Sequence, residues 1–264
     1  MNLNMVITIQ IMNSKWNGNY KFNQKIIMHK EVIEDLKKLK NPDKAMILSR
    51  FFKTWEWEYW EWDKFLWIPV PPQREIAKKY YEKCSLDDIE KLLKSEYHEV
   101  RMTWFLILCY KYELTTKKKL NDEQKKIIDF YLSHLEYSNN WDLVDLVCYK
   151  ILWNYLLDKD RKVLYELADN KNMWKQRVAI VSTMTFVKKW QFEDTLKISE
   201  TLLTHKHDLI HKAVWWLLRE VWKKDEKVLK NFLDKYANKM PRTMLRYAIE
   251  KLNESERKHY LNIY

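Results

Sequence analysis

Cysteine is scarce in this 264-residue sequence, and no apolar run is long enough to cross a membrane. The three cysteines, Cys84, Cys109 and Cys148, lie far apart and form no CxxC pair. This excludes a disulfide framework and a cysteine-based zinc site, and we expect reduced thiols in the core of a cytoplasmic protein. The apolar start, residues 5–12, is too short for a span and lacks the basic and small-residue flanks of a signal peptide.

Glycine is almost absent. The chain contains one glycine, Gly18, and 14 tryptophans, whereas average usage of about 7% would give roughly 18 glycines. Residues 54–67 read TWEWEYWEWDKFLW. Five tryptophans in one short acidic segment would expose apolar surface, so this imbalance requires an explanation other than packing.

Strand-like alternation is also missing, and helical spacing of apolar residues dominates from residue 30 onward. Pro72 begins one predicted helix, and Ser85 caps the next, with Asp87 and Asp88 in its first turn. Further amphipathic segments are predicted over 97–113, 122–136, 140–157, 161–169, 173–189, 192–204, 207–222, 225–236 and 241–251. Short paired helices that recur about every 35–45 residues are typical of an all-α, HEAT-like solenoid of antiparallel helices; an irregular bundle is the alternative.

The charge balance is strongly basic. Lysine and arginine number 48 against 37 acidic residues, which gives a formal net charge of +11 and a pI of about 9.2. Such a balance favours a polyanionic partner, which is either nucleic acid or an anionic membrane surface. A concave basic face along a helical stack would suit a DNA duplex.

Four strings in the sequence are specific enough to indicate a family. They are FFKT with PVP and Arg74 (51–74), NNWDLVD (139–145), WKQR (174–177), and the pair KA…W…LRE and MPRT…LRYA (212–248). In this order they resemble the AlkD-like DNA alkylation repair glycosylases over roughly residues 29–262. The resemblance implies a HEAT-like domain over 29–264, and residues 1–28 are expected to be an N-terminal extension.

The resemblance implies hydrolysis of the N-glycosidic bond of N3- and N7-alkylated purines, such as 3-methyladenine and 7-methylguanine, in duplex DNA. These cationic bases are good leaving groups. Catalysis therefore needs only a carboxylate near the sugar, which stabilises the positive charge of the sugar and positions the attacking water. The resemblance assigns this role to Asp145. It implies a monomeric enzyme with no cofactor and no metal, which works without the deep pocket of base-flipping glycosylases.

The residues support DNA contact independently. Trp141 and Asp145 are four positions apart and share a helix face, as do Lys212, Trp216 and Arg219 at i, i+4 and i+7. A tryptophan between cations can stack on a sugar or base while the cations meet phosphates. The expected DNA-binding set is Trp141, Arg177, Trp216, Lys212, Arg219, Arg242 and Arg246.

Several residues have simpler alternative interpretations. Arg242 and Arg246 could serve packing and ion pairs, and Arg177 could pair with a neighbouring acid. His205, His207 and His211 have loose spacing for zinc and no completing cysteine or carboxylate cluster, which favours a local structural role. For the whole chain, the alternatives are a non-catalytic HEAT-like scaffold for DNA or protein and a membrane-surface protein.

The tryptophan excess coincides with glycine positions of the resembled family. The clear positions are Trp55, Trp57, Trp60, Trp62, Trp67, Trp153, Trp190, Trp215 and Trp222, and Trp104 is a further candidate. Some bacterial lineages read the UGA codon as glycine, whereas others read it as tryptophan. We therefore predict that these nine codons are UGA and that the protein made in the cell has glycine there.

Overall fold

The computed structural model describes residues 28–44 and 63–263, and these residues are helical with connecting loops. The only bridge between extended segments in this part of the chain is a parallel one between Lys64 and Tyr97. The first helix begins at Met28, one residue before the expected start of the domain. The rest of the expected extension, and Trp55 to Trp62 of the tryptophan-rich segment, lie outside the described residues.

The described N-terminal part of the chain contains one long helix and five shorter helical segments. They are α2 (Met28–Lys38), η2 (Pro42–Lys44), α4 (Val70–Tyr80), α5 (Leu86–Leu93), α6 (His98–Lys117) and α7 (Asn121–Ser133). Helix α6 contacts α2, α4, α5 and α7 and is buried over most of its length. The predicted cap of α5 is confirmed, because Ser85 and Asp88 form a reciprocal capping box.

The C-terminal helices continue the stack. They are η3 (Leu135–Tyr137), α8 (Trp141–Asp145), α9 (Cys148–Leu156), α10 (Lys162–Ala168), α11 (Met173–Ser182), α12 (Met184–Lys188), α13 (Glu193–Leu202), α14 (Asp208–Lys224), α15 (Glu226–Tyr236), η4 (Ala237–Lys239), α16 (Arg242–Ala248) and α17 (Glu254–Asn262). Successive helices joined by short links pack as antiparallel pairs, such as α10 with α11 and α13 with α14.

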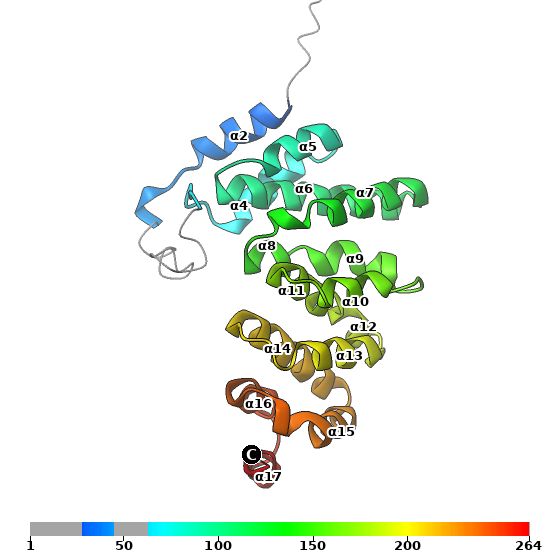
Figure 1. Ribbon diagram of the computed structural model, residues 1–264. Helices are drawn as coiled ribbons and strands as arrows, with labels where there is room; N and C mark the ends of the chain where they lie inside the picture. Colours follow the sequence, from blue (N-terminus) through cyan, green and yellow to red (C-terminus); the bar gives the residue numbers. More distant parts are fainter. Residues whose placement is uncertain (1–27, 45–62, 264) are drawn as a thin grey trace, which may run out of the picture.

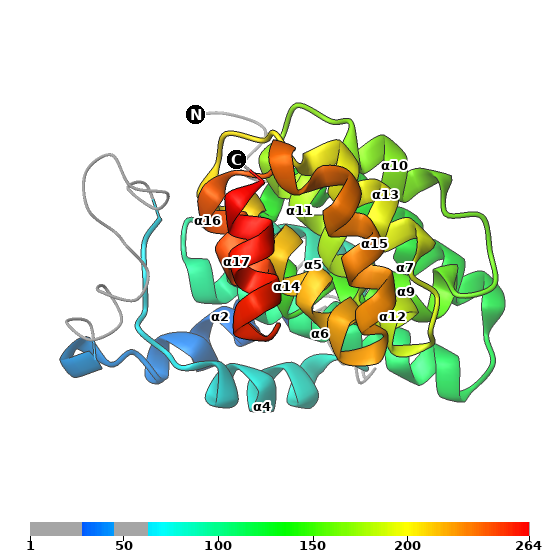
Figure 2. The ribbon, with the colours of Figure 1, turned by 90° about the horizontal axis from the view of Figure 1, so that it is seen from below.

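Two rows of helices run down the stack (Figure 1). Helices α8, α11, α14 and α16 contact one another in turn and form the row that we call the inner row. Helices α10, α13 and α15 lie in the other row, which is also apparent when the stack is seen from its C-terminal end (Figure 2). The inner helices start at residues 141, 173, 208 and 242, so the repeat is 32, 35 and 34 residues, at or just below the expected range. The predicted all-α solenoid is confirmed.

Two helices predicted as continuous are each broken in two. The segment 140–157 divides into α8 and α9 at Val147, whose φ of −122° and ψ of −53° depart from helical geometry. The segment 173–189 divides at Thr183, whose hydroxyl donates to the Ile180 carbonyl at 2.7 Å. Such local side-chain bonds compete with the main-chain ladder and bend helices.

Helix α17 was not expected from the sequence. Its N-terminus is capped by Asn253, whose side chain accepts from the Glu256 N–H at 3.0 Å. The helix is polar on most of its surface, and Tyr260 is its buried residue. A helix with so little apolar surface lacks the periodicity by which helices are found in a sequence.

Two of the predicted glycine positions have left-handed backbone. Positive φ occurs in the described residues at Trp67 (61°), Trp190 (63°) and Lys119 (55°). Trp190 directly follows the C-terminal cap of α12, where its N–H donates to Val187 and the next N–H donates to Phe186. This is the hydrogen-bond pattern of a Schellman motif, in which glycine is the usual left-handed residue.

Other tryptophans at predicted glycine positions have unsatisfied indoles. The Nε1 atoms of Trp215 and Trp222, and that of the candidate Trp104, are buried and have no hydrogen-bond partner among the described residues. A buried donor without a partner costs about 1–3 kcal/mol. The family-type residues Trp141, Trp174 and Trp216 do not share this defect. Left-handed backbone at Trp67 and Trp190 and unpaired indoles at Trp215 and Trp222 are features that glycine would remove. The assignment of glycine at the nine positions, like that of their codons, stays a prediction.

Replacing Trp190 with glycine should stabilise the chain. The side chain is 61% exposed, so little burial is lost, and the left-handed conformation costs a non-glycine residue about 1–2 kcal/mol. We expect thermal unfolding of Trp190→Gly to show a Tm about 2–8 °C higher. Trp174→Gly, within helix α11, should lower the Tm instead. A Trp190→Gly variant with unchanged or lower Tm would contradict the assignment, as would tryptophan at this position in mass spectra of the native protein.

Candidate functional site

Helix α8 carries both Trp141 and Asp145 on a single short segment. Asn140 caps its N-terminus by accepting from the Asp142 N–H, and Asp142 accepts from the Leu143 N–H at 2.8 Å. Trp141 and Asp145 occupy the two ends of the helix, and both are half-buried. The NNWDLVD string thus specifies a capped helix that holds an indole and a carboxylate.

Arg177 of α11 joins Asp145 to two neighbouring helices. Its Nε donates to Asp145 Oδ1 at 2.9 Å and its Nη2 donates to Asp145 Oδ2 at 2.6 Å. Its Nη1 donates to the Leu209 carbonyl in the first turn of α14. The guanidinium side chain is 6% exposed and that of Asp145 is 15% exposed. A buried, bidentate pair therefore fixes the carboxylate at the contact of α8, α11 and α14.

This environment sets the charge of Asp145. Burial raises the pKa of Asp145 above its ordinary value, and the Arg177 guanidinium opposes that rise. Because arginine stays protonated and donates two charge-assisted hydrogen bonds, we expect the carboxylate to be anionic at neutral pH. Each carboxylate oxygen keeps a further lone pair that can accept a bond from water.

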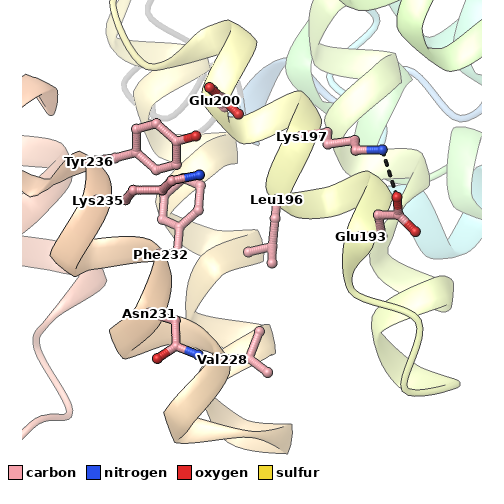
Figure 3. Close-up of a pocket in the computed structure, with 9 residues that line it drawn as sticks. All are labelled: Glu193, Leu196, Lys197, Glu200, Val228, Asn231, Phe232, Lys235 and Tyr236. Carbon is pink, nitrogen blue, oxygen red and sulfur yellow. Dashed lines mark hydrogen bonds and ion pairs between the residues drawn. The ribbon is translucent and has the colours of Figure 1, made fainter.

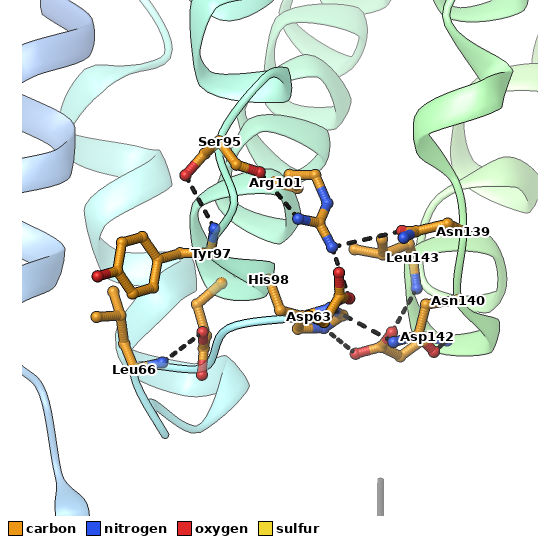
Figure 4. Close-up of polar contacts among 11 residues, drawn as sticks. Asp63, Leu66, Ser95, Tyr97, His98, Arg101, Asn139, Asn140, Asp142 and Leu143 are labelled. Carbon is orange, nitrogen blue, oxygen red and sulfur yellow. Dashed lines mark hydrogen bonds and ion pairs between the residues drawn. The ribbon is translucent and has the colours of Figure 1, made fainter. Parts of the chain in front are cut away.

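A second group of buried charges lies beside the N-terminal end of α8 (Figure 4). His98 Nε2 is 2.9 Å from Asp142 Oδ2, and His98 Nδ1 is 3.5 Å from Asp63 Oδ2. Arg101 Nη2 donates to Asp63 Oδ2 at 2.6 Å, and to the Asn139 side chain at 3.4 Å. Burial opposes charge on the ring, but Asp142 and Asp63 outweigh it and raise the pKa of His98 to about 9.

The extended segment 63–69 is anchored to α6 through its backbone. Glu99, which is buried, accepts from the N–H groups of Leu66 (2.8 Å) and Ile68 (3.2 Å). The His98 N–H donates to the Lys64 carbonyl at 2.8 Å. The first turn of α6 thus contacts both this segment and α8.

The remaining expected DNA-binding residues lie on α14 and α16, which pack against each other. Lys212 is exposed and pairs with Asp208 at 2.9 Å; Arg219 pairs with Glu250 at 3.1 Å. Trp216 is half-buried, about 10 Å along the α14 axis from Leu209. Exposed pairs contribute little stability, so phosphates can compete for these cations.

The two arginines of α16 differ in their contacts. Arg242 donates to the Leu261 carbonyl of α17 at 2.6 Å, which fits the packing alternative for this residue. Arg246 is exposed and has no ion-pair partner among the described residues. Arg246 is therefore the more available of the two for an external anion.

The histidine cluster serves local structure. His207 caps α14 by accepting from the Leu209 N–H at 3.2 Å, and His205 accepts from the His207 N–H at 3.0 Å. The side chain of His211 contacts the His205 carbonyl.

In the described part of the chain no group of histidine, cysteine and acidic residues is arranged to bind a metal. None of its helices combines the length and apolar composition needed to cross a bilayer.

Surface cavities in the described part of the chain lie on other elements. One, of about 370 Å³, lies between α13 and α15 in the other row, with Phe232 and Tyr236 in its lining and a Lys197–Glu193 ion pair at its edge (Figure 3). Another, of about 480 Å³, is lined by residues of α4, α6 and α9, including Arg74 and Tyr149. The linings of these cavities do not include Asp145 or the indoles expected to contact DNA.

A family model described as "DNA alkylation repair enzyme" matches residues 32–252. The chain belongs to the DNA alkylation repair enzyme family. This assigns it a role in DNA repair, and the matched region contains Asp145 and all seven residues expected to bind DNA. No curated protein matches the sequence. A solved structure described as a predicted DNA alkylation repair enzyme from Enterococcus faecalis has the same fold, with 16% identity and a TM-score of 0.58 over 81% of this chain and 97% of that chain.

Family membership did not point to the charges around His98. Three of the ionisable residues, His98, Glu99 and Arg101, lie in the first turn of α6, directly before the buried run Met102–Cys109. The signal in the sequence is the string HEVR at 98–101, which places three ionisable residues directly before the apolar run MTWFLILC at 102–109. Ionisable groups at buried positions need partners, so this string could have indicated a polar cluster.

The Arg177–Asp145 pair should show strong coupling in stability. Removing either partner leaves a buried charge alone and costs about 3–5 kcal/mol. We expect Arg177→Leu and Asp145→Leu each to lose this much in denaturant unfolding, and the double variant to lose less than the sum. The exposed Lys212–Asp208 pair serves as the control, with coupling below about 1 kcal/mol. Additive losses at Arg177 and Asp145 would show that the pair is not a unit.

Proposed function

We propose that this repair protein is a DNA glycosylase that hydrolyses the N-glycosidic bond of N3- and N7-alkylated purines in duplex DNA. Asp145 is the catalytic carboxylate in this proposal. The observation that carries it is the bidentate pair with buried Arg177, which holds the carboxylate in one orientation while 15% of the Asp145 side chain stays exposed. The proposed enzyme acts in the cytoplasm, as a monomer and without a cofactor or metal.

The chemistry suits a site with a single carboxylate. An alkylated purine with positive charge leaves readily, and the sugar then develops oxocarbenium character. Asp145 stabilises that charge through space and orients the attacking water with its remaining lone pairs. The proton of the water passes to the carboxylate or to solvent as the new C–O bond forms. No general acid is required, because the departing base is neutral once the bond has broken.

Arg177 has a different role in this proposal from direct phosphate contact. Its guanidinium is buried and all three of its donor nitrogens have partners. It keeps Asp145 ionised and in place, and it reduces the repulsion between that carboxylate and nearby phosphates. Trp141 and Trp216 are the surfaces for sugar or base stacking, and Lys212, Arg219, Arg242 and Arg246 are the phosphate-binding set.

Asp145→Asn should separate binding from chemistry. The amide removes the negative charge, so release of 7-methylguanine or 3-methyladenine should fall on the order of 100-fold or more. Affinity for duplex should stay the same or increase, because one charge that repels phosphate is gone. The measurement is single-turnover base release from the full chain with glycine at the nine exchanged positions, corrected for the rate without enzyme.

The matched control is Asp194→Asn. Asp194 accepts from Arg161 at 2.6 Å and from Tyr165 at 2.8 Å, so this change also weakens a largely buried charge network, but in the other row of helices. It should lower stability and leave base release unchanged at temperatures where both variants are folded. Base release by Asp145→Asn at the parent rate would refute the catalytic assignment. An inactive parent that still binds duplex would favour the non-catalytic scaffold.

Arg246→Ala tests the phosphate-binding set. Because phosphate contacts carry no sequence or lesion information, the change should weaken binding to damaged and undamaged duplex equally. It should also reduce the slope of log Kobs against log salt by about one. Lys125→Ala on α7, where the lysine is exposed and pairs with Asp129 at 2.6 Å, is the control and should leave the slope unchanged. An unchanged slope in Arg246→Ala would remove this residue from the interface.

A further inference from the structure

Helix α8 depends on external contacts for its position. It has five residues, and so short a helix has little stability of its own. Arg177 holds its C-terminal end through Asp145. Its N-terminal end is held by Asp142, which is 4% exposed and contacts the His98 ring. The Asn140 amide also lies 3.4 Å from His98 Nδ1.

From this geometry we infer that His98, acting through Asp142, is a positioning residue that fixes α8 and thereby sets Asp145 for base excision. The inference rests on the proposed function. The His98 ring contacts Asp142, Asp63 and Asn140 and stacks on Phe65, so its effect on Asp145 passes through Asp142 and helix α8. Asp142 and Asp145 are three residues apart on one helix, so a shift of the first moves the second.

The surrounding charges favour a cationic ring. Three carboxylates face His98, from α8, the extended segment and α6: Asp142, Asp63 and Glu99. Arg101 of α6 is the cation beside them, and it pairs with Asp63. Without a proton on His98, three buried carboxylates would face one guanidinium. The Asp145–Arg177 pair beyond Asp142 is neutral as a unit, and Lys64 pairs with Glu96 at the surface. The protonated ring therefore bridges α8 and the segment 63–69.

His98→Ala is the direct test in the full chain. We expect single-turnover base release to fall about 10- to 100-fold, since a displacement of about 1 Å at a catalytic group has this effect. Affinity for undamaged duplex should be retained. Amide hydrogen exchange should accelerate in residues 141–145, because α8 loses one of its two anchors.

Two further variants separate positioning from general destabilisation. His98→Gln is milder and can place its Nε2 donor near that of the ring, so it should recover most of the base release and of the α8 protection. Asp194→Asn should lower the Tm as His98→Ala does, yet leave base release and α8 exchange unchanged. Both comparisons are made at temperatures where all variants are folded.

The pH dependence gives a third readout. His98 is charged at neutral pH and loses its proton as the pH rises through about 9, after which it resembles the neutral glutamine. The ratio of base release by the parent to that by His98→Gln should therefore exceed one at pH 7 and approach one above pH 9. Effects of pH on the substrate cancel in this ratio.

Two outcomes overturn the inference, and they differ from failure of the proposed function. If His98→Ala lowers the Tm but keeps the parent rate and the parent α8 exchange, His98 is a structural residue only. If the parent itself releases no alkylated base, the glycosylase proposal fails. In that case, amide hydrogen exchange in α8 still tests whether His98 holds this helix. Unchanged protection of residues 141–145 in His98→Ala would show that it does not.

Discussion

The buried guanidinium of Arg177 constrains the arrangement of the inner row. Its donors need acceptors, because an unpaired buried cation would cost several kcal/mol. The acceptors come from α8 and α14, on either side of the helix that carries the arginine. The three helices must therefore keep one register for the charge to be satisfied. Apolar packing tolerates small shifts of one helix along another, whereas a bidentate ion pair and a hydrogen bond to a carbonyl do not. The polar contacts of Arg177 therefore fix the relative positions of the three helices more narrowly than the hydrophobic core does.

The two ends of α8 are held in different ways. Its C-terminal carboxylate meets a permanent cation on α11, whereas its N-terminal carboxylate meets a histidine on α6 whose charge depends on its surroundings. The same turn of α6 anchors the segment 63–69 through Glu99 and Arg101. Residues that are distant in sequence thus converge on a five-residue helix. This convergence explains how so short an element can hold a functional group in one orientation.

Sequence periodicity predicted the solenoid and most of the helices, because apolar residues recur at helical spacing along the chain and some helix starts, such as that at Ser85, have a recognisable cap. It failed where tertiary structure decides. Val147 and Thr183 break helices whose apolar spacing is continuous, and α17 has too little apolar surface to be detected. The motif strings placed Asp145, Trp141 and Arg177 in the candidate site. The alternative interpretation of Arg177, pairing with an acid, is the one that the structure shows. The strings did not name Asp145 as that acid or indicate that His98 lies against Asp142, since both contacts join residues more than 30 positions apart.

The Arg177–Asp145 pair has a consequence for how such a protein can diverge. A lineage that no longer needs the carboxylate cannot simply lose it, because the arginine would remain buried without its counter-ion. Losing the arginine first would leave the carboxylate stranded in the same way. The two positions are therefore expected to change together, or through an intermediate that is partly unfolded. Among relatives, a chain with both residues replaced by apolar ones would be a stable scaffold, whereas a chain with only one replaced would be under selection to restore or remove the other.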